Sequence, residues 1–104
     1  MAELPVLNAS NPTTIPEKVY DRVWIEEVII RARDPNGDFG GEVKLHKYGM
    51  FDGKAELEPG NGQWIIVEEI LAKSEEDADL QAAMAAIINY VSKLGAENNI
   101  INTA

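Results

Sequence analysis

The clearest pattern in the chain is a helical spacing of large apolar residues near its C-terminal end. Five of them recur at intervals of four and three: Leu80, Met84, Ile87, Val91 and Leu94. This spacing places them on one face of a helix with 3.6 residues per turn. We expect that face to be buried, with Ile87 at its centre.

Polar residues and a glycine suggest where this helix begins and ends. Ser74 is a favourable N-cap, and Asp77 three residues later resembles the second member of a capping box. Gly95 is suited to the left-handed conformation that often follows the last helical residue. The sequence therefore predicts a helix over Ser74 to Leu94.

Earlier segments favour strands. Val19–Arg33 is rich in β-branched and aromatic residues, and it carries apolar groups at both odd and even positions. Glu42–Tyr48 alternates between apolar and polar residues, and Gln63–Val67 is a short apolar run. Between them, Gly49–Gly62 is predicted as a long polar loop with a short edge strand at Lys54–Glu58.

These elements predict an α+β fold. We expect a small antiparallel β-sheet of three to four strands, packed by one long C-terminal helix. Residues 19–104 would form a single α+β domain, and residues 1–18 an extended N-terminal arm. The motivation is the change from an apolar period of two to a period of 3.6 after Val67.

The N-terminal 18 residues combine helix-breaking and apolar positions. Three prolines interrupt regular structure, and four large apolar residues lie among turn formers: Leu4, Val6, Leu7 and Ile15. One interpretation is an arm that is mobile in the free protein and becomes ordered against a neighbouring chain. The other is a frayed terminus.

Composition narrows the classes of function. The 104 residues carry a net charge of −9, from 18 acidic and 9 basic side chains. Such a chain is repelled by phosphate backbones, so direct nucleic-acid binding is disfavoured. The acidity suits either solubility or contact with a basic protein surface. There is no cysteine, no apolar run of membrane-spanning length and no signal-peptide pattern at the start.

Catalytic and metal-binding patterns are weak. The turn Asp34–Gly41 has oxygen-bearing residues at alternate positions, but Phe39 and Leu45 occupy the positions where a calcium loop needs glycine and glutamate. His46, the single histidine, is expected on the polar, solvent-facing side of its strand. No nucleophile, acid and base fall into a recognisable arrangement. We therefore expect a protein that is not an enzyme, with no catalytic, cofactor-binding or metal-binding residues and no small-molecule substrate.

Candidate interface residues come from three places in the sequence. Met50 and Phe51 are apolar groups in the polar loop, and Ala82, Ala86 and Asn89 form a small-residue face on the helix. The alanines suit either close approach of a partner or simple helix formation. Together with the apolar residues of the arm, the interface hypothesis comprises Leu4, Val6, Leu7, Ile15, Met50, Phe51, Ala82, Ala86 and Asn89.

The order of these features resembles small virion structural proteins of tailed bacteriophages. The resemblance rests on VYDRVWIEEVII opening a hairpin, a DPNG turn, WIIVEEILAKS and then DADLQAAMAAIINYVSKLG. It covers roughly Val19 to Ile101. It implies a structural or assembly protein of a phage head, neck or tail, present in many copies and bound to other virion proteins and to copies of itself. The expected location is the virion, with a soluble form in the host cytoplasm before assembly.

A second hypothesis is a small acidic inhibitor that imitates DNA and binds a basic partner. Such a protein needs carboxylates in rows on a solvated face. Here the charges are interspersed with apolar residues, which counts against this hypothesis.

Overall fold

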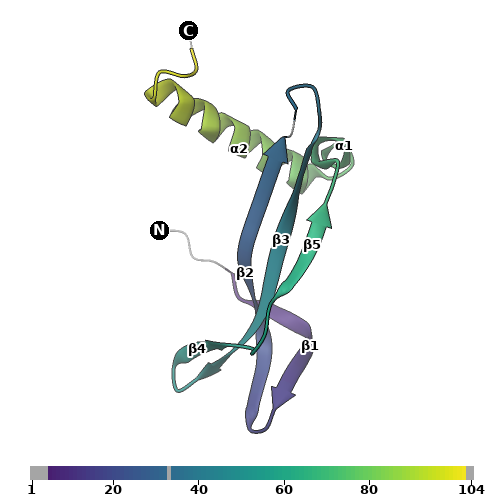
Figure 1. Ribbon diagram of the computed structural model, residues 1–104, viewed down its shortest axis with the longest axis vertical. Coiled ribbons are helices and arrows are strands. Elements are labelled where there is room, and N and C mark those ends of the chain that lie inside the picture. The colour runs from purple at the N-terminus through teal and green to yellow at the C-terminus, as the bar shows by residue number, and fades with distance from the viewer. Residues whose placement is uncertain (1–4, 33, 103–104) are drawn as a thin grey trace. The chain divides into compact units, whose positions relative to one another are not determined.

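The computed structural model describes residues 5–32 and 34–102 and has the α+β fold that the sequence predicts (Figure 1). Its elements, in chain order, are β1 (Leu7–Ile15), β2 (Lys18–Ala32), β3 (Phe39–Phe51), β4 (Lys54–Leu57), β5 (Gln63–Val67), α1 (Ile70–Ser74) and α2 (Ala78–Glu97). The chain divides into two compact units. The sheet unit comprises residues 1–30 and 41–67, and the helical unit comprises residues 31–40 and 68–104.

The sheet is organised around β3. The strand order is β1-β2-β3-β4, and β5 also pairs with β3. β4 and β5 pair antiparallel with successive parts of β3: Tyr48 lies opposite Leu57, whereas Val43 lies opposite Ile65. One long central strand therefore pairs with β2 along one side and with two short strands along the other. In Figure 1, β5 lies beside the upper part of β3 and β4 beside its lower part.

The strands largely agree with the sequence prediction. β2 and β5 match the predicted segments to within one residue at each end, and β4 occupies the suggested short strand. β3 is longer than Glu42–Tyr48 at both ends and includes Gly49. A Cβ on that glycine would lie 2.5 Å from the carbonyl oxygen of Val19. Gly49 therefore allows close approach of two strands instead of forming part of a loop.

The N-terminal segment is extended, as expected, but it belongs to the sheet of its own chain. β1 pairs antiparallel with β2, with a shift in register between Asn8 and Thr13. Pro12, which has no N–H group, lies in this irregular stretch on an edge strand, where proline is tolerated. The Nζ of Lys47 also donates hydrogen bonds to the backbone oxygen of Asn11 and, at 3.2 Å, to Thr13 Oγ1. These contacts anchor β1 without a neighbouring chain.

The turn between β2 and β3 caps a helix that begins more than thirty residues later. Helix α1 starts after Glu69, which has a left-handed backbone and provides no side-chain cap. The Asp38 carboxylate instead accepts hydrogen bonds from the backbone N–H groups of Leu71 at 2.8 Å and Ala72 at 3.1 Å. Burial alone would raise the pKa of Asp38, but these bonds and one from Phe39 outweigh it and lower the pKa. The N-terminus of α1 is thus satisfied from outside the helix.

We expect the substitution Asp38→Ala to lower the thermal midpoint and to loosen α1. The reason is that two helix N–H groups lose their acceptor. Because the folded pKa is depressed, this stabilisation is present above the unfolded value of 3.8 and is lost as the pH falls below it. Thermal melts at pH values above and below 3.8 measure the change in the midpoint. Hydrogen exchange at the backbone amides of Leu71 and Ala72 measures the loosening of α1. Glu76→Ala, which removes an exposed charge from the same unit, should leave both unchanged.

The main helix starts and ends later than predicted. Its N-cap is Asp77, whose Oδ1 accepts from the N–H groups of Asp79 and Leu80. Ser74 is instead the last residue of α1, where its hydroxyl donates to the Leu71 oxygen at 2.6 Å. A serine used to close one helix cannot also cap the next.

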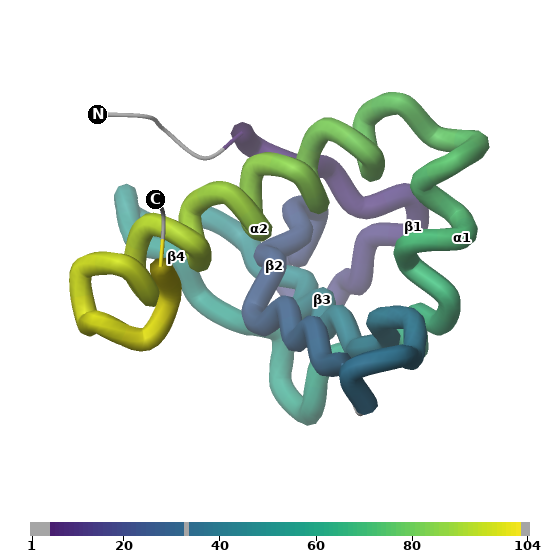
Figure 2. Tube along the Cα trace, turned by 90° about the horizontal axis from the view of Figure 1, so that it is seen from above, coloured from purple at the N-terminus to yellow at the C-terminus, as the bar shows by residue number. Residues whose placement is uncertain are grey.

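The C-terminal end of α2 also differs from the prediction. Gly95 lies inside the helix, and the left-handed position is taken by Asn99, with φ of 58°. A Cβ on Gly95 would lie 2.4 Å from the side chain of Ile101, so the glycine makes room for the chain as it folds back. Figure 2 shows this returning segment at the end of α2. The side chain of Asn98 donates to the Leu94 oxygen at 2.8 Å and closes the last turn.

Each unit has only a small buried core. In the sheet unit, Tyr20 is 2% exposed and its ring meets Phe51 edge-on, with 5.5 Å between ring centroids. In the helical unit α1 packs against α2, and the buried residues are Ile70, Ser74 and Met84. Ile87, expected to be buried, is 43% exposed. Much of the apolar surface of the described residues therefore remains accessible to solvent.

Candidate assembly interface

One face of the sheet carries an apolar groove. Tyr48 and Leu57 lie opposite each other on β3 and β4, as do Met50 and Ala55, and paired residues project to the same side. Trp24 from β2 joins them, and together these five residues line a cavity of about 410 Å³. Trp24, Met50 and Leu57 are each 42% exposed. The groove is therefore an open apolar surface in the sheet unit.

Two further apolar residues extend the same face along β5. Trp64 lies opposite Lys44, and the Lys44 ammonium is 5.4 Å from the centre of the Trp64 ring. Ile66, two residues further along β5, projects to the same side and is 71% exposed. We call the side defined by Trp24, Tyr48, Met50, Leu57, Trp64 and Ile66 the tryptophan face.

A compact polar cluster lies in the middle of the tryptophan face. The Glu26 carboxylate is 3.1 Å from Lys44 Nζ and 3.3 Å from His46 Nδ1. His46 Nε2 lies 2.9 Å from the backbone oxygen of Glu58, which can only accept, so Nε2 carries a proton and donates. The expectation that His46 faces solvent is wrong, because the residue is 7% exposed. The bond to the Glu58 oxygen and the close approach of Nδ1 to the Glu26 carboxylate explain how a polar ring is tolerated there.

Glu26 is the anionic member of the cluster. Its hydrogen bond from Lys44 lowers its pKa, burial acts in the opposite direction, and His46 lowers it further. The negative charge of the Glu26 carboxylate and the positive charge of the Lys44 ammonium therefore offset each other on this face.

We expect Glu26→Gln to make the free energy of unfolding depend less on pH in the acid range. Because the folded pKa of Glu26 lies below its ordinary value of 4.5, the carboxylate stabilises the fold above that pH. This contribution is lost as the pH falls below 4.5. Denaturant unfolding at a series of pH values measures it. Glu27→Gln removes the same charge from the opposite side of β2 and should leave the profile nearly unchanged, and equal effects of the two variants would contradict the assignment.

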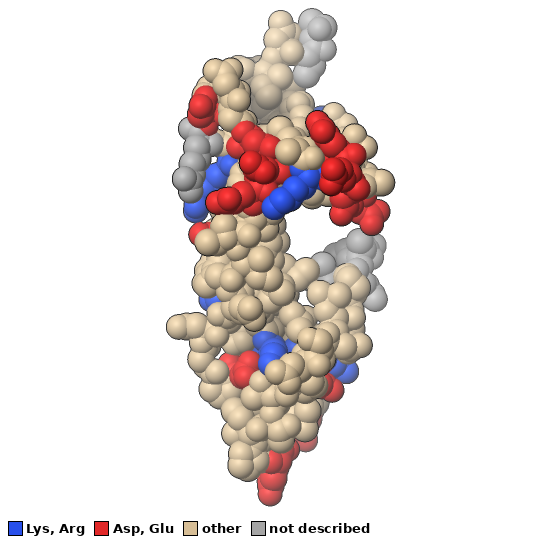
Figure 3. Space-filling model, turned by 90° about the vertical axis from the view of Figure 1, so that its right-hand side faces the viewer, with Lys and Arg blue, Asp and Glu red and all other residues tan. Residues whose placement is uncertain are grey.

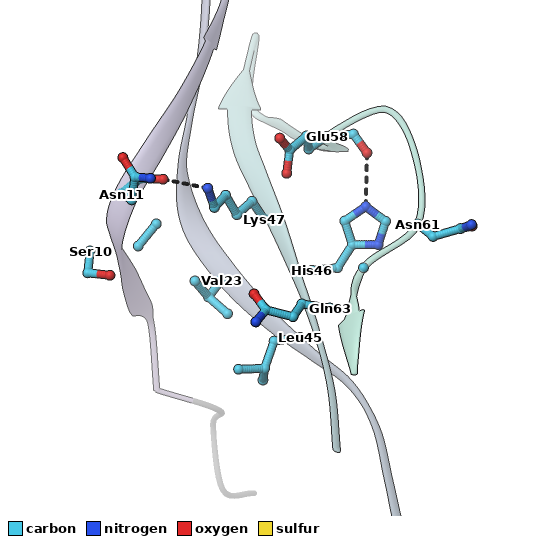
Figure 4. A pocket seen from close by; sticks show the side chains of 11 residues that line it. Ser10, Asn11, Val23, Leu45, His46, Lys47, Glu58, Asn61 and Gln63 are labelled. Carbon is cyan, nitrogen blue, oxygen red and sulfur yellow. Dashed lines mark hydrogen bonds between the residues drawn. The ribbon is translucent and has the colours of Figure 1, made fainter. Parts of the chain in front are cut away.

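A more polar pocket of about 580 Å³ is lined by residues of β1, of β3 and of the loop between β4 and β5, with His46 and Glu58 among them (Figure 4). Val23 and Leu45 form its apolar wall, and Lys47 reaches across to Asn11 in β1. The Lys47 ammonium therefore links the central strand β3 to the edge strand β1. Among residues 5–32 and 34–102, no group of three His, Cys, Asp or Glu side chains could hold a metal ion.

The predicted interface residues do not form one site. Leu4 lies outside the described residues. Val6 is 59% exposed just before β1, while Leu7 and Ile15 lie at opposite ends of that strand. Met50 lies in the groove, whereas its neighbour Phe51 turns to the other side and packs on Tyr20.

The predicted helical candidates lie on α2. Ala82, Ala86 and Asn89 are all exposed and share one face of the helix by their spacing. Larger apolar residues of α2 are exposed too, including Tyr90 at 55% and Val91 at 54%. The helix therefore presents more apolar surface than the small-residue face alone.

Acidic residues are concentrated in one short stretch. Residues 68–79 contain six acidic side chains and one lysine: Glu68, Glu69, Glu75, Glu76, Asp77, Asp79 and Lys73. All seven are exposed. Figure 3 shows acidic side chains gathered in the upper part of the view, with a basic one among them.

Comparison of the chain with known protein families, curated proteins and solved structures found no match. The described residues contain no helix that is both long enough and apolar enough to span a membrane.

Proposed function

We propose that this chain is a non-enzymatic structural or assembly protein of a phage particle. It works through protein–protein contacts in a multi-copy assembly and binds other virion proteins and copies of itself. The observation that carries the assembly role is the amount of exposed apolar surface. Large apolar residues are exposed on both sides of the sheet and along α2.

Exposed apolar residues within each unit support this role. In the sheet unit, Trp24, Trp64 and Ile66 are 42%, 45% and 71% exposed. In the helical unit, Tyr90 and Val91 are 55% and 54% exposed. Contact with other chains would remove this surface from water and stabilise the folded state.

The phage setting comes from the sequence resemblance over Val19 to Ile101. A head, neck or tail protein needs no catalytic site, and its role is met by surfaces that join neighbouring subunits. Such a protein is present in the finished particle, so the proposal has a direct test.

Two measurements test the proposal. Analytical ultracentrifugation of the full chain across a range of concentrations should show self-association. Mass spectrometry of purified phage particles should find the chain in many copies per particle. A protein that stays monomeric at high concentration and is absent from particles would overturn the proposal.

An acidic inhibitor is the second candidate, favoured by the concentration of charge in residues 68–79, which carry a net −5 at neutral pH. Such a protein would be a monomer or compact dimer and would bind a basic DNA-binding protein with an affinity that falls steeply with salt. Salt-dependent binding by a non-associating chain would favour this candidate over the assembly role.

A further inference from the structure

We infer that the tryptophan face is the surface through which two copies of this chain associate, sheet face against sheet face. The inference deepens the proposed function and rests on it, since it names the surface that mediates self-association. The partner is a second copy, which would cover Trp24, Met50 and Leu57 at one end of the face and Trp64 and Ile66 at the other.

The composition of this face is that of an interface core. Trp24 and Trp64 are the two tryptophans of the chain, and they are 42% and 45% exposed. Aromatic side chains that fill grooves contribute a large share of the binding energy in protein–protein interfaces. The cavity of about 410 Å³ beside Trp24 offers such a groove. Face-to-face packing of two sheets is a common way to bury residues of this kind.

The opposite side of the sheet is less suited to a partner. There Val23 and Leu45 are only partly exposed, and the Lys47 ammonium is bound to Asn11 and Thr13 of β1. A partner on that side would have to displace these contacts. The tryptophan face requires no such change.

The distribution of charge permits two identical chains to meet at the sheet. Of the net −9, residues 68–79 account for −5, and this stretch belongs to the helical unit. On the tryptophan face the Glu26 carboxylate is paired with Lys44. Two copies would therefore meet over nearly neutral surface there, whereas contact through residues 68–79 would bring like charges together.

Two of the sheet's edge strands, β4 and β5, are short, and a third, β1, is irregular. β4 has four residues and β5 has five, so the edge that they form offers only short runs of free backbone groups. On the other side β1, which contains Pro12 and an irregular register, covers β2 as far as Val23, and β2 itself forms the edge from Trp24 to Ala32. Short strands and prolines are the features by which edges resist pairing with another chain.

The location of both tryptophans gives a test without a label. In the unmodified chain, dilution from high to low concentration should shift tryptophan emission to longer wavelengths in parallel with dissociation seen by ultracentrifugation. Acrylamide should quench the fluorescence more strongly in the dilute protein. Dissociation without any change in emission or quenching would show that copies meet elsewhere, and it would overturn the inference.

Paired variants test the same surface by substitution. Trp24→Gln with Trp64→Gln should raise the dimer dissociation constant roughly 100-fold or more. The matched control is Ile25→Gln with Ile65→Gln, adjacent residues that project to the other side and are 47% and 44% exposed. The control should associate as the unmodified chain does. Circular dichroism checks that both double variants are folded.

The outcomes separate the inference from the proposed function. If the unmodified chain associates and the control variant alone dissociates, the face is wrong while the assembly role stands. If the unmodified chain does not associate at any concentration, the self-association on which the proposed function rests also fails. Loss of association in the tryptophan variant alone, together with the emission shift, supports the inference.

Discussion

Replacing Gly41 by alanine is expected to destabilise the sheet by about 3 kcal/mol or more, the largest effect of any small substitution in β3. A Cβ at this position would lie 1.8 Å from the carbonyl oxygen of Ile29. No rotamer change relieves this clash, because both groups belong to the backbone framework. β2 and β3 would have to separate locally, with loss of the hydrogen bonds between them. Chemical denaturation of the purified variant measures the cost.

Gly37→Ala is the matched control for this prediction. Gly37 lies in the turn between β2 and β3, and a Cβ there would meet the nearest atom, the Asp34 oxygen, at an ordinary 3.5 Å. We expect this variant to unfold within about 0.5 kcal/mol of the unmodified chain. Similar losses for the two variants would mean that the strands do not approach closely at Gly41.

Replacing Met84 by alanine is expected to cost about 2–5 kcal/mol. Met84 is 4% exposed and is the buried residue of α2 in the small core that the helical unit forms. Truncation would leave a cavity between α1 and α2, and few other buried side chains could fill it. Thermal unfolding followed by circular dichroism would show the loss.

Ile87→Ala provides the comparison on the same helix. Ile87 is three residues further along and is 43% exposed, so its truncation in dilute protein should cost only about 1 kcal/mol. A greater cost for Ile87 than for Met84 under conditions where the chain is monomeric would contradict the burial in this structure. A cost that grows with protein concentration would instead indicate that association covers Ile87.

The regular elements could be predicted from the sequence because their patterns are local. The β-branched run around Trp24 indicates β2, and the spacing from Leu80 to Leu94 indicates α2. β1 was harder to foresee, since Pro12 argues against a central strand and only the topology shows that this strand lies at an edge. Which strands pair with one another is determined by the whole fold, so it cannot be read from a single segment.

The ends of the helices and the burial of His46 depend on contacts with residues elsewhere in the chain. Local sequence patterns do not contain these contacts. Ser74 and Gly95 are both suitable end residues, yet Ser74 closes α1 and Gly95 accommodates Ile101. His46 alternates with apolar residues and so was expected at the surface. Its burial follows from Glu26 and from the backbone oxygen of Glu58, which lie 20 and 12 residues away in sequence.

The candidate site was only partly visible in the sequence. The sequence marks Met50 as an apolar residue in polar surroundings, and Met50 lines the groove. The remaining groove residues come from β2, β3 and β4, and only the strand register brings them to one side. Alternation places Trp24 on one side of its strand, but it does not relate that side to Trp64, which lies 40 residues further along the chain. Register is fixed by pairing, so it had to come from the structure.

The contact from Asp38 to α1 has a consequence for the order of folding. A five-residue helix is too short to be stable in water by itself, and here its N-terminal N–H groups are satisfied by a carboxylate 33 and 34 residues earlier in the chain. The turn between β2 and β3 must therefore form before α1 can persist. We expect the β2–β3 hairpin to fold first and α1 to fold after it. A peptide that begins at Glu68 would lack Asp38, and its first helical turn would remain frayed even where α2 is formed.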